Sequence, residues 1–482
     1  MIAGPMSLTI LDRRRRQAAR IALYGSLVLV TGATLALIKV VGRPPQLKKV
    51  EEDWLKRDYA NLPEVKLLQE YVRIDTSETT GDEIAGARFL AKQFEAAGIP
   101  ARIEIVGEKK ANLYARLEGK DPRPLVLHNH IDVEPVDPAE WTYPPFEGRI
   151  ELPWIHGRGT FDMKSVAIAQ LLAMIELKKS GVPLTRSVLF LATSSEERGS
   201  RLGVRRILET QPELVKSFWA VLTEGGVVEA RARDDIKFWG TEVAQRRYVD
   251  LIVRSDDKEK LEQLRQEVLA WAPKVAESEP RLTPEVAEVF KTYAPTRDRE
   301  DLRRLVGNPE KAIASQPEFK LLPDYLRSML KNEAVPFPVR EDEGGGYRMI
   351  IKFQLLPGVE LSDVRQKLVP DRMLAGLSVT VDEPPSARHG SPVDHEVLRA
   401  IGETLHEAYP GTPTGPYFLP MTATDSRFFR AAGVPSYGFS PFLIMNTDTF
   451  QVDRANERFG LPGFVEGVEI YRKLVRRLAS DT

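Results

Sequence analysis

The chain has 482 residues, with 68 Lys plus Arg against 69 Asp plus Glu, and it contains no cysteine. This near balance of charge argues against a general nucleic-acid binder, so we expect no nucleic-acid partner. Without cysteine there can be no disulfide, thiolate zinc site, iron–sulfur cluster or cysteine nucleophile. Any bound metal must be held by Asp, Glu and the six His residues.

Residues 1–50 are typical of a membrane anchor and linker. Four arginines at 13–16 precede an apolar stretch over about 21–38. Its roughly 18 residues approach the ~20 that cross a bilayer as a helix. A cleaved signal peptide is the alternative, although its apolar core is usually about 7–15 residues. We therefore expect a single-pass transmembrane helix and a membrane-anchored protein whose remaining part is exported, periplasmic or extracytoplasmic.

From residue 51 to 245 the chain alternates between strand-like and helix-like segments. Strands are expected at about 125–128, 187–193 and 218–222, and helices at 164–179 and 201–209. This alternation predicts an α/β domain with a mixed, mainly parallel sheet flanked by helices. Such sheets bind ligands at the carboxyl ends of their strands.

Residues 246–386 change character and predict an inserted, small α+β domain with an antiparallel sheet. The expected elements are a strand at 248–253, a helix at 257–271, a strand at 348–355, a helix at 361–368 and a strand at 378–382. A charged helical insertion interrupts them over about 273–339. Residues 387–482 return to the larger α/β domain and end in a helix over about 463–479.

Polar residues gather near the ends of the predicted strands. His130 and Asp132 follow the first strand, and in extended chain they project to the same side. Asp162 lies at a glycine-rich turn before a helix, where a helix N-cap is the alternative. Glu196 with Glu197 and then Glu224 follow the next two strands, with surface turns as the alternative. We expect these acids to converge at four successive strand ends.

In order and spacing these residues resemble the di-zinc aminoacylase/carboxypeptidase metallopeptidase family, in its carboxypeptidase S-like and N-acyl-amino-acid hydrolase branch. The resemblance runs from about residue 54 to the end. It is carried by His130-x-Asp132-Val133-x-Pro135, Gly157-Arg158-Gly159, Asp162-Met163-Lys164, Glu196-Glu197, Glu224-Gly225-Gly226, Thr424-Asp425-Ser426-Arg427 and Asn456-Glu457. It implies a zinc-exopeptidase-like fold and hydrolysis of amide bonds in small peptides or N-acyl amino acids.

The resemblance also implies roles for single residues. Two Zn²⁺ ions would be held by His130, Asp162, Glu197 and Glu224, with Asp162 bridging them. Glu196 would be the general base, and Asp132 would support His130. Substrate contacts are expected from Arg427, Asn456 and Gln354.

Two positions depart from the family pattern. Asp453 stands where the family has its last metal-ligating His, so the site is richer in carboxylate, and Mn²⁺ or a single metal ion is the alternative. Gln354 stands where the family has a carboxylate-binding Arg, and a neutral amide cannot replace a guanidinium. A third departure lies in the inserted domain, which the resemblance implies to be a lid or dimerisation domain. Residues 254–257 lack the His that the family places there to reach across a dimer, although a homodimer is compatible with the sequence. A pseudoenzyme that retains the fold and at most one zinc is the alternative function, and the retained Glu196 and Glu197 favour an enzyme.

Overall fold

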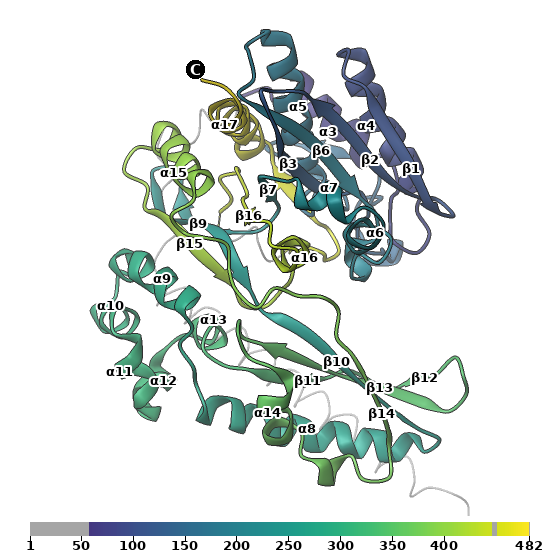
Figure 1. Cartoon of the computed structure of the whole chain (residues 1–482), viewed down its shortest axis with the longest axis vertical. Coiled ribbons are helices and arrows are strands. Elements are labelled where there is room, and N and C mark those ends of the chain that lie inside the picture. Colours follow the sequence, from purple (N-terminus) through teal and green to yellow (C-terminus); the bar gives the residue numbers. More distant parts are fainter. Residues whose placement is uncertain (1–56, 446–450, 482) are drawn as a thin grey trace, which may run out of the picture. The chain divides into compact units, whose positions relative to one another are not determined.

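A nine-stranded mixed sheet dominates the computed structural model, which describes residues 57–445 and 451–481 (Figure 1). The strand order is β1 (Ala101–Gly107), β2 (Lys110–Leu117), β6 (Arg186–Thr193), β3 (Asp121–His130), β7 (Ala220–Thr223), β16 (Ser436–Gly438), β9 (Asp235–Gln245) and β15 (Thr414–Leu419), with β8 (Val227–Ala232) paired to β9. The centre of the sheet, from β6 through β3 and β7 to β16, is parallel. The predicted α/β class with parallel central strands is confirmed.

The central strands are apolar because helices cover both of their faces. Helices α3 (Pro63–Val72), α4 (Glu83–Ala96), α5 (Lys164–Ser180) and α17 (Leu461–Ala479) lie on one side of the sheet, and α6 (Val204–Thr210), α7 (Pro212–Lys216) and α16 (Ser426–Ala431) on the other (Figure 1). On the second side Val126, Leu189 and Val221 of the strands pack against Ile207 and Phe428 in one buried cluster. Burial on both faces is the usual condition of parallel strands.

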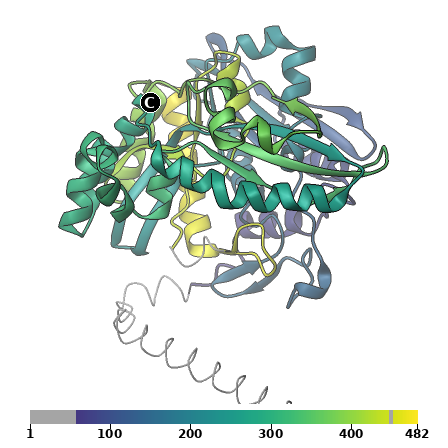
Figure 2. The same cartoon turned by 90° about the horizontal axis from the view of Figure 1, so that it is seen from below.

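A second, five-stranded antiparallel sheet is built from residues 247–382, called here the five-stranded unit. Its order is β11 (Glu333–Pro336), β13 (Tyr347–Leu355), β10 (Arg247–Ser255) and β14 (Ser378–Asp382), with β12 (Arg340–Glu341) paired to β13. Helices α8 (Lys258–Ser278) and α14 (Leu361–Leu368) pack together, and α8 covers one face of the sheet (Figure 2). Burial alternates along β10, so one face of the sheet packs on α8 and the other stays open.

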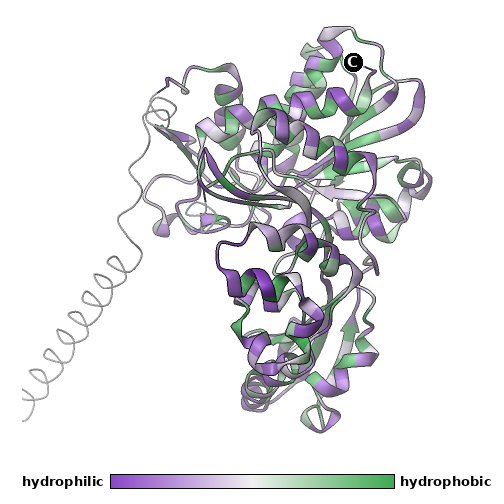
Figure 3. Ribbon diagram, turned by 90° about the vertical axis from the view of Figure 1, so that its left-hand side faces the viewer, coloured by the Kyte–Doolittle hydropathy of each residue, from purple (hydrophilic) through white to green (hydrophobic). Residues whose placement is uncertain are grey.

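Helix α8 is longer than the sequence predicts, because it passes through Pro273 to end at Ser278. Proline normally ends a helix by removing a hydrogen bond and clashing with the preceding turn. Here Val268, Ala272 and Ala276 continue the buried face of the helix on both sides of the proline. Tertiary packing along this face therefore outweighs the local cost. Figure 3 shows that the helices carry both hydrophobic and hydrophilic residues, as expected for helices with one buried side.

The charged insertion within the five-stranded unit is helical over most of its predicted range of about 273–339, although strand β11 lies near the end of that range. It comprises α9 (Pro284–Tyr293), α10 (Glu300–Gly307), α11 (Pro309–Ala314), α12 (Gln316–Leu321) and α13 (Asp324–Ser328). Helix α9 packs on β15 of the large sheet. The remaining elements are α15 (Glu396–Ala408) and a small sheet of β4 (Arg149–Glu151), β5 (Trp154–His156) and β17 (Arg458–Gly460).

The predicted membrane localisation needs correction. Within residues 57–445 and 451–481, no helix combines the length and apolar character needed to cross a membrane. This finding contradicts the expected membrane-anchored, exported protein. The segment predicted as the anchor, residues 21–38, lies outside the described residues.

A buried ion pair joins α16 to β9 of the large sheet. The two terminal guanidinium nitrogens of Arg430, Nη1 and Nη2, donate to the two carboxylate oxygens of Glu242 at 2.6 and 2.7 Å. The side chains are 3% and 0% exposed. Bidentate geometry and extra bonds from Arg430 to Ser391 and Ser436 satisfy both charges.

Glu242→Gln should lower the free energy of unfolding by about 3 kcal/mol, because it leaves the buried Arg430 charge uncompensated. Urea unfolding followed by circular dichroism would measure the change. Glu213→Gln, which breaks an exposed pair with Lys216, is the control and should shift stability by less than about 0.5 kcal/mol. Equal effects of the two variants would contradict this role for the buried pair.

Candidate metal-dependent active site

Three adjacent strands of the large sheet deliver polar residues to one edge. His130 is the last residue of β3, Glu196 and Glu197 lie in the turn after β6, and Glu224 follows β7. Because these strands are parallel neighbours, their carboxyl ends meet. Asp162 arrives differently, from the turn before α5, and not from a strand of this sheet. The predicted convergence at strand ends therefore holds for three of the four segments.

His130 lies at the centre of the cluster and is 1% exposed. Its Nε2 lies 2.9 Å from Asp162 Oδ1 and 3.8 Å from Glu224 Oε2. Its Nδ1 lies 2.8 Å from the backbone carbonyl oxygen of Asp132 and 3.6 Å from the Asp132 carboxylate. The main chain of Asp132 is thus the nearer partner of the ring, and Nε2 faces the acids.

The Asp132 carboxylate instead connects β3 to the turn after β6. Its two oxygens accept the backbone N–H groups of Glu196 and Glu197, each at 3.0 Å. Asp132 is fully buried, so these bonds are shielded from water and fix the start of the turn. The sequence linked Asp132 only to His130, and the structure adds a role in presenting both glutamates.

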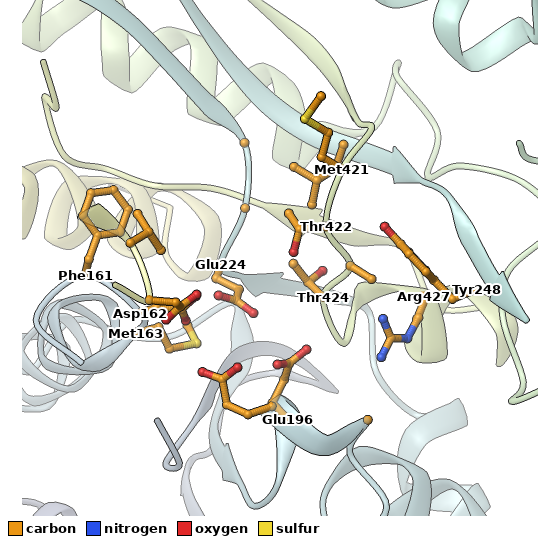
Figure 4. A pocket seen from close by; sticks show the side chains of 18 of the residues that line it. Phe161, Asp162, Met163, Glu196, Glu224, Tyr248, Met421, Thr422, Thr424 and Arg427 are labelled. Carbon is orange, nitrogen blue, oxygen red and sulfur yellow. The ribbon is translucent and has the colours of Figure 1, made fainter. Parts of the chain in front are cut away.

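The donor atoms form two overlapping sets. His130, Asp162 and Glu197 offer atoms within 4.8 Å of one another, and so do His130, Glu196 and Glu224. Figure 4 shows the labelled carboxylates of Asp162, Glu196 and Glu224 facing the same space. One oxygen of Glu197 is buried without a hydrogen-bond partner in the part of the chain that the structure describes. Imidazole nitrogen and carboxylate oxygen are ordinary ligands of Zn²⁺, so this donor set fits a divalent ion.

Burial raises the pKa values of the three glutamates in this cluster, whereas His130 outweighs burial at Asp162 and lowers the pKa of that carboxyl. Burial, with a contribution from Asp162, raises the pKa of Glu197 to about 11 and that of Glu224 to about 7. Burial and the charge of Glu224 also raise the pKa of Glu196. Burial lowers the pKa of His130, but Glu224, Asp132 and Asp162 outweigh it and raise the pKa well above its usual value. The cluster thus gathers more negative than positive groups, and a bound cation would compensate them.

Asp453 lies at the border of this cluster. It lines the same cleft but belongs to neither donor set, and its Oδ1 lies 3.8 Å from Nη1 of Arg158. Burial, followed by the charges of Asp162 and Glu457, raises the pKa of Asp453 to about 8. The expected metal-ligating role of Asp453 stays a prediction.

A buried ion pair that the sequence did not assign holds Asp162 in place. Arg158 donates to Glu457 at 2.5 Å, and the other oxygen of Glu457 accepts the backbone N–H of Phe161 at 2.8 Å. The side chains are 3% and 0% exposed. Arg158 and Glu457 appear in the matched motifs, but their pairing joins positions 299 residues apart and had no signal in the spacing of the chain.

The acids open into a large cleft between loops of the large sheet and the open face of the five-stranded unit. Its volume is about 1480 Å³. Of the predicted site residues, the cleft is lined by Asp162, Glu196, Glu197, Glu224, Arg427 and Asp453. Residues of the five-stranded unit that line it include Tyr248 and Lys352.

Two predicted substrate contacts are occupied by the protein itself. The side-chain oxygen of Asn456 accepts the backbone N–H of Thr142 at 2.7 Å. The side-chain oxygen of Gln354 accepts from Arg246 at 2.5 Å. Neither Asn456 nor Gln354 is among the residues that line the cleft.

Comparison with known proteins agrees with this arrangement. Rat aminoacylase-1A is 25% identical over 440 residues, which cover 87% of this chain and 96% of that protein. Human aminoacylase-1 is 23% identical over 440 residues with the same coverage.

Two solved structures share the fold. An M20 family metallo-carboxypeptidase from Sulfolobus solfataricus has a TM-score of 0.65 at 18% identity and covers 86% of this chain and 99% of its own. A dipeptidase from Saccharomyces cerevisiae has a TM-score of 0.60 at 13% identity, with coverages of 86% and 95%. The model of peptidase family M20/M25/M40 matches residues 126–477. This match spans most of the 482 residues and confirms the resemblance seen in the motifs, so the chain belongs to peptidase family M20/M25/M40.

Proposed function

We propose that the protein is a metal-dependent hydrolase of amide bonds in small peptides or N-acyl amino acids. The observation that carries the proposal is the convergence of His130 with Asp162, Glu196, Glu197 and Glu224 at one end of a large cleft. The names of the similar proteins, which include aminoacylases, a carboxypeptidase and a dipeptidase, support this substrate class.

Two zinc ions would be held by His130, Asp162, Glu197 and Glu224, with Asp453 as a fifth donor, and when bound they would activate a water and polarise the scissile carbonyl. Glu196 is the proton carrier: it accepts the proton of the attacking water and passes it to the leaving amine. Burial raises the pKa of Glu196, which favours retention of that proton until the amine departs. Asp132 keeps Glu196 and Glu197 in register through their backbone N–H groups.

Glu196→Gln should reduce turnover of N-acyl amino acids by about 10²–10⁴-fold, because the amide cannot accept a proton. Metal content should stay at the wild-type value if Glu196 is a proton carrier. Steady-state kinetics and elemental analysis would measure the two quantities. The control is Glu209→Gln on α6, which is exposed.

Two results would contradict this assignment. Wild-type turnover in the Glu196→Gln variant would remove Glu196 from the mechanism. No turnover by the wild-type protein on any dipeptide or N-acyl amino acid, with less than one equivalent of metal, would favour a non-catalytic binding protein.

Asp453→Ala should lower the metal content from two equivalents toward one if Asp453 is a ligand. Asp453→His, which places the family's usual ligand there, should keep two equivalents. Elemental analysis after dialysis against metal-free buffer would measure both. Asp301→Ala at an exposed ion pair is the control. Two equivalents in Asp453→Ala would remove Asp453 from the metal site.

Metal-stripped protein should lose stability as the pH rises from 5.5 to 8. A carboxyl whose pKa is raised by folding binds its proton more tightly in the folded state, so its stabilising effect is lost as the pH rises. For Glu224 this loss extends from the ordinary value of 4.5 to about 7. The raised pKa of His130 acts in the same direction, since its stabilising effect is present below 6.5 and lost above it.

Thermal melts of stripped and zinc-loaded protein would test this. Zinc should raise the Tm more at pH 8 than at pH 5.5, because the ion compensates the ionised acids. Glu224→Gln should flatten the pH dependence of the stripped protein. A Tm of the stripped protein that rises with pH over this range would contradict the expected crowding of charge.

A further inference from the structure

The strand pairing that places Gln354 also places a tyrosine in the cleft. Tyr248 of β10 is the register partner of Gln354 of β13, so the two side chains lie on the same face of the sheet. Tyr248 lines the cleft, whereas Gln354 does not and is bonded to Arg246. A polar group therefore faces the cleft from the strand next to Gln354.

Two polar atoms in this part of the cleft lack partners. Tyr248 Oη and Arg427 Nε are both buried, and neither has a hydrogen-bond partner within residues 57–445 and 451–481. Buried polar groups are nearly always hydrogen-bonded. Two unsatisfied donors that line one cleft indicate a place for a ligand that accepts hydrogen bonds.

The two side chains are neighbours. Figure 4 shows Tyr248 and Arg427 next to each other at one side of the cleft. Asp162 lies at the opposite side, and Glu196 lies between them. Burial raises the pKa of Tyr248, although the cations of Arg246 and Arg427 act against this. The phenol therefore keeps its proton at neutral pH and can donate it in a hydrogen bond. The charge of Arg427 also acts on Glu196, where it opposes the raised pKa, so Arg427 lies close to the proton carrier.

In contrast to Arg427, which lies on α16, two cations that the five-stranded unit contributes to the cleft already have carboxylate partners. Lys352 lies 3.7 Å from Asp250, and Arg348 lies 3.6 Å from Asp342. Arg427 instead stacks over the ring of Phe428, with 4.6 Å between its guanidinium carbon and the ring centroid. Its charge is thus better placed to receive an anion than those of Lys352 and Arg348.

We propose that Tyr248 and Arg427 together bind the free carboxylate of the substrate, with Tyr248 donating from Oη and Arg427 from its guanidinium. This inference rests on the proposed function and assigns to Tyr248 part of the substrate binding that Gln354 was expected to perform. A guanidinium and a phenol that donate to one carboxylate form charge-assisted hydrogen bonds, which are stronger than neutral ones. The ligand would also connect β10 of the five-stranded unit with α16 of the large sheet.

The test compares N-acetylmethionine with its neutral analogue N-acetylmethioninamide. Tyr248→Phe removes only the hydroxyl and should lower kcat/KM for the acid by roughly tenfold or more, with a much smaller effect on the amide. In an Arg427→Gln background the same substitution should cost less, because both groups hold one carboxylate. Tyr347→Phe is the matched control, since Tyr347 lies on β13 but does not line the cleft, and its acid-to-amide ratio should equal that of the wild type.

The outcomes separate this inference from the proposed function. An unchanged acid-to-amide ratio in Tyr248→Phe, or an equal loss for both substrates, would overturn the inference while leaving the hydrolase intact. If the wild type turns over neither compound, calorimetric titration of the zinc-loaded protein with N-acetylmethionine decides. Binding that weakens in Tyr248→Phe and not in Tyr347→Phe would support the carboxylate site without the hydrolase. Equal binding by the two variants, or none by the wild type, would overturn it.

Discussion

The hydrogen bonds from the backbone of Glu196 and Glu197 to the Asp132 carboxylate organise the whole site. They join the end of β3 to the turn after β6, at the edge where the parallel strands finish. Because the same short segment carries His130, one buried carboxylate sets the positions of the imidazole and of two acids at once. Burial of the charged Asp132 carboxylate costs free energy, but its hydrogen bonds to two backbone N–H groups are strong once formed. These bonds therefore hold the geometry of the turn that carries Glu196 and Glu197.

Bringing the acids together creates a second constraint, which is electrostatic. Asp162, Glu196, Glu197 and Glu224 converge in a space where burial already disfavours their charges. At the centre His130 offers a positive group, whereas the nearby Arg158 is committed to Glu457. A fold selected for stability alone would not gather these charges, so their cost is best understood as preparation for a cation.

Much of this could be predicted from the sequence, because the elements and the acids follow local rules. Alternation of strands and helices gave the class of the large sheet, and the helix at 361–368 and the strand at 378–382 have the predicted bounds. Other features depend on contacts between distant residues and left no local pattern. The Arg158–Glu457 pair and the extension of α8 past Pro273 are of this kind. Asn456 lies in a matched motif, whereas Gln354 departs from the family pattern. The side chains of both bond within the protein, which sequence spacing cannot reveal.

The fate of Gln354 shows how a binding function can move without changing the fold. Buried Arg246 donates to Gln354 and to Glu333, so a second arginine at position 354 would face a cation that already needs its partners. Across the strand pair, Tyr248 has no such conflict, and it lines the cleft near Arg427. The β10–β13 register keeps positions 248 and 354 side by side. An amide at position 354 and a phenol at position 248 can therefore replace a cation at position 354 without changing the sheet. What changes is the source of positive charge, which then comes from α16 and not from the five-stranded unit.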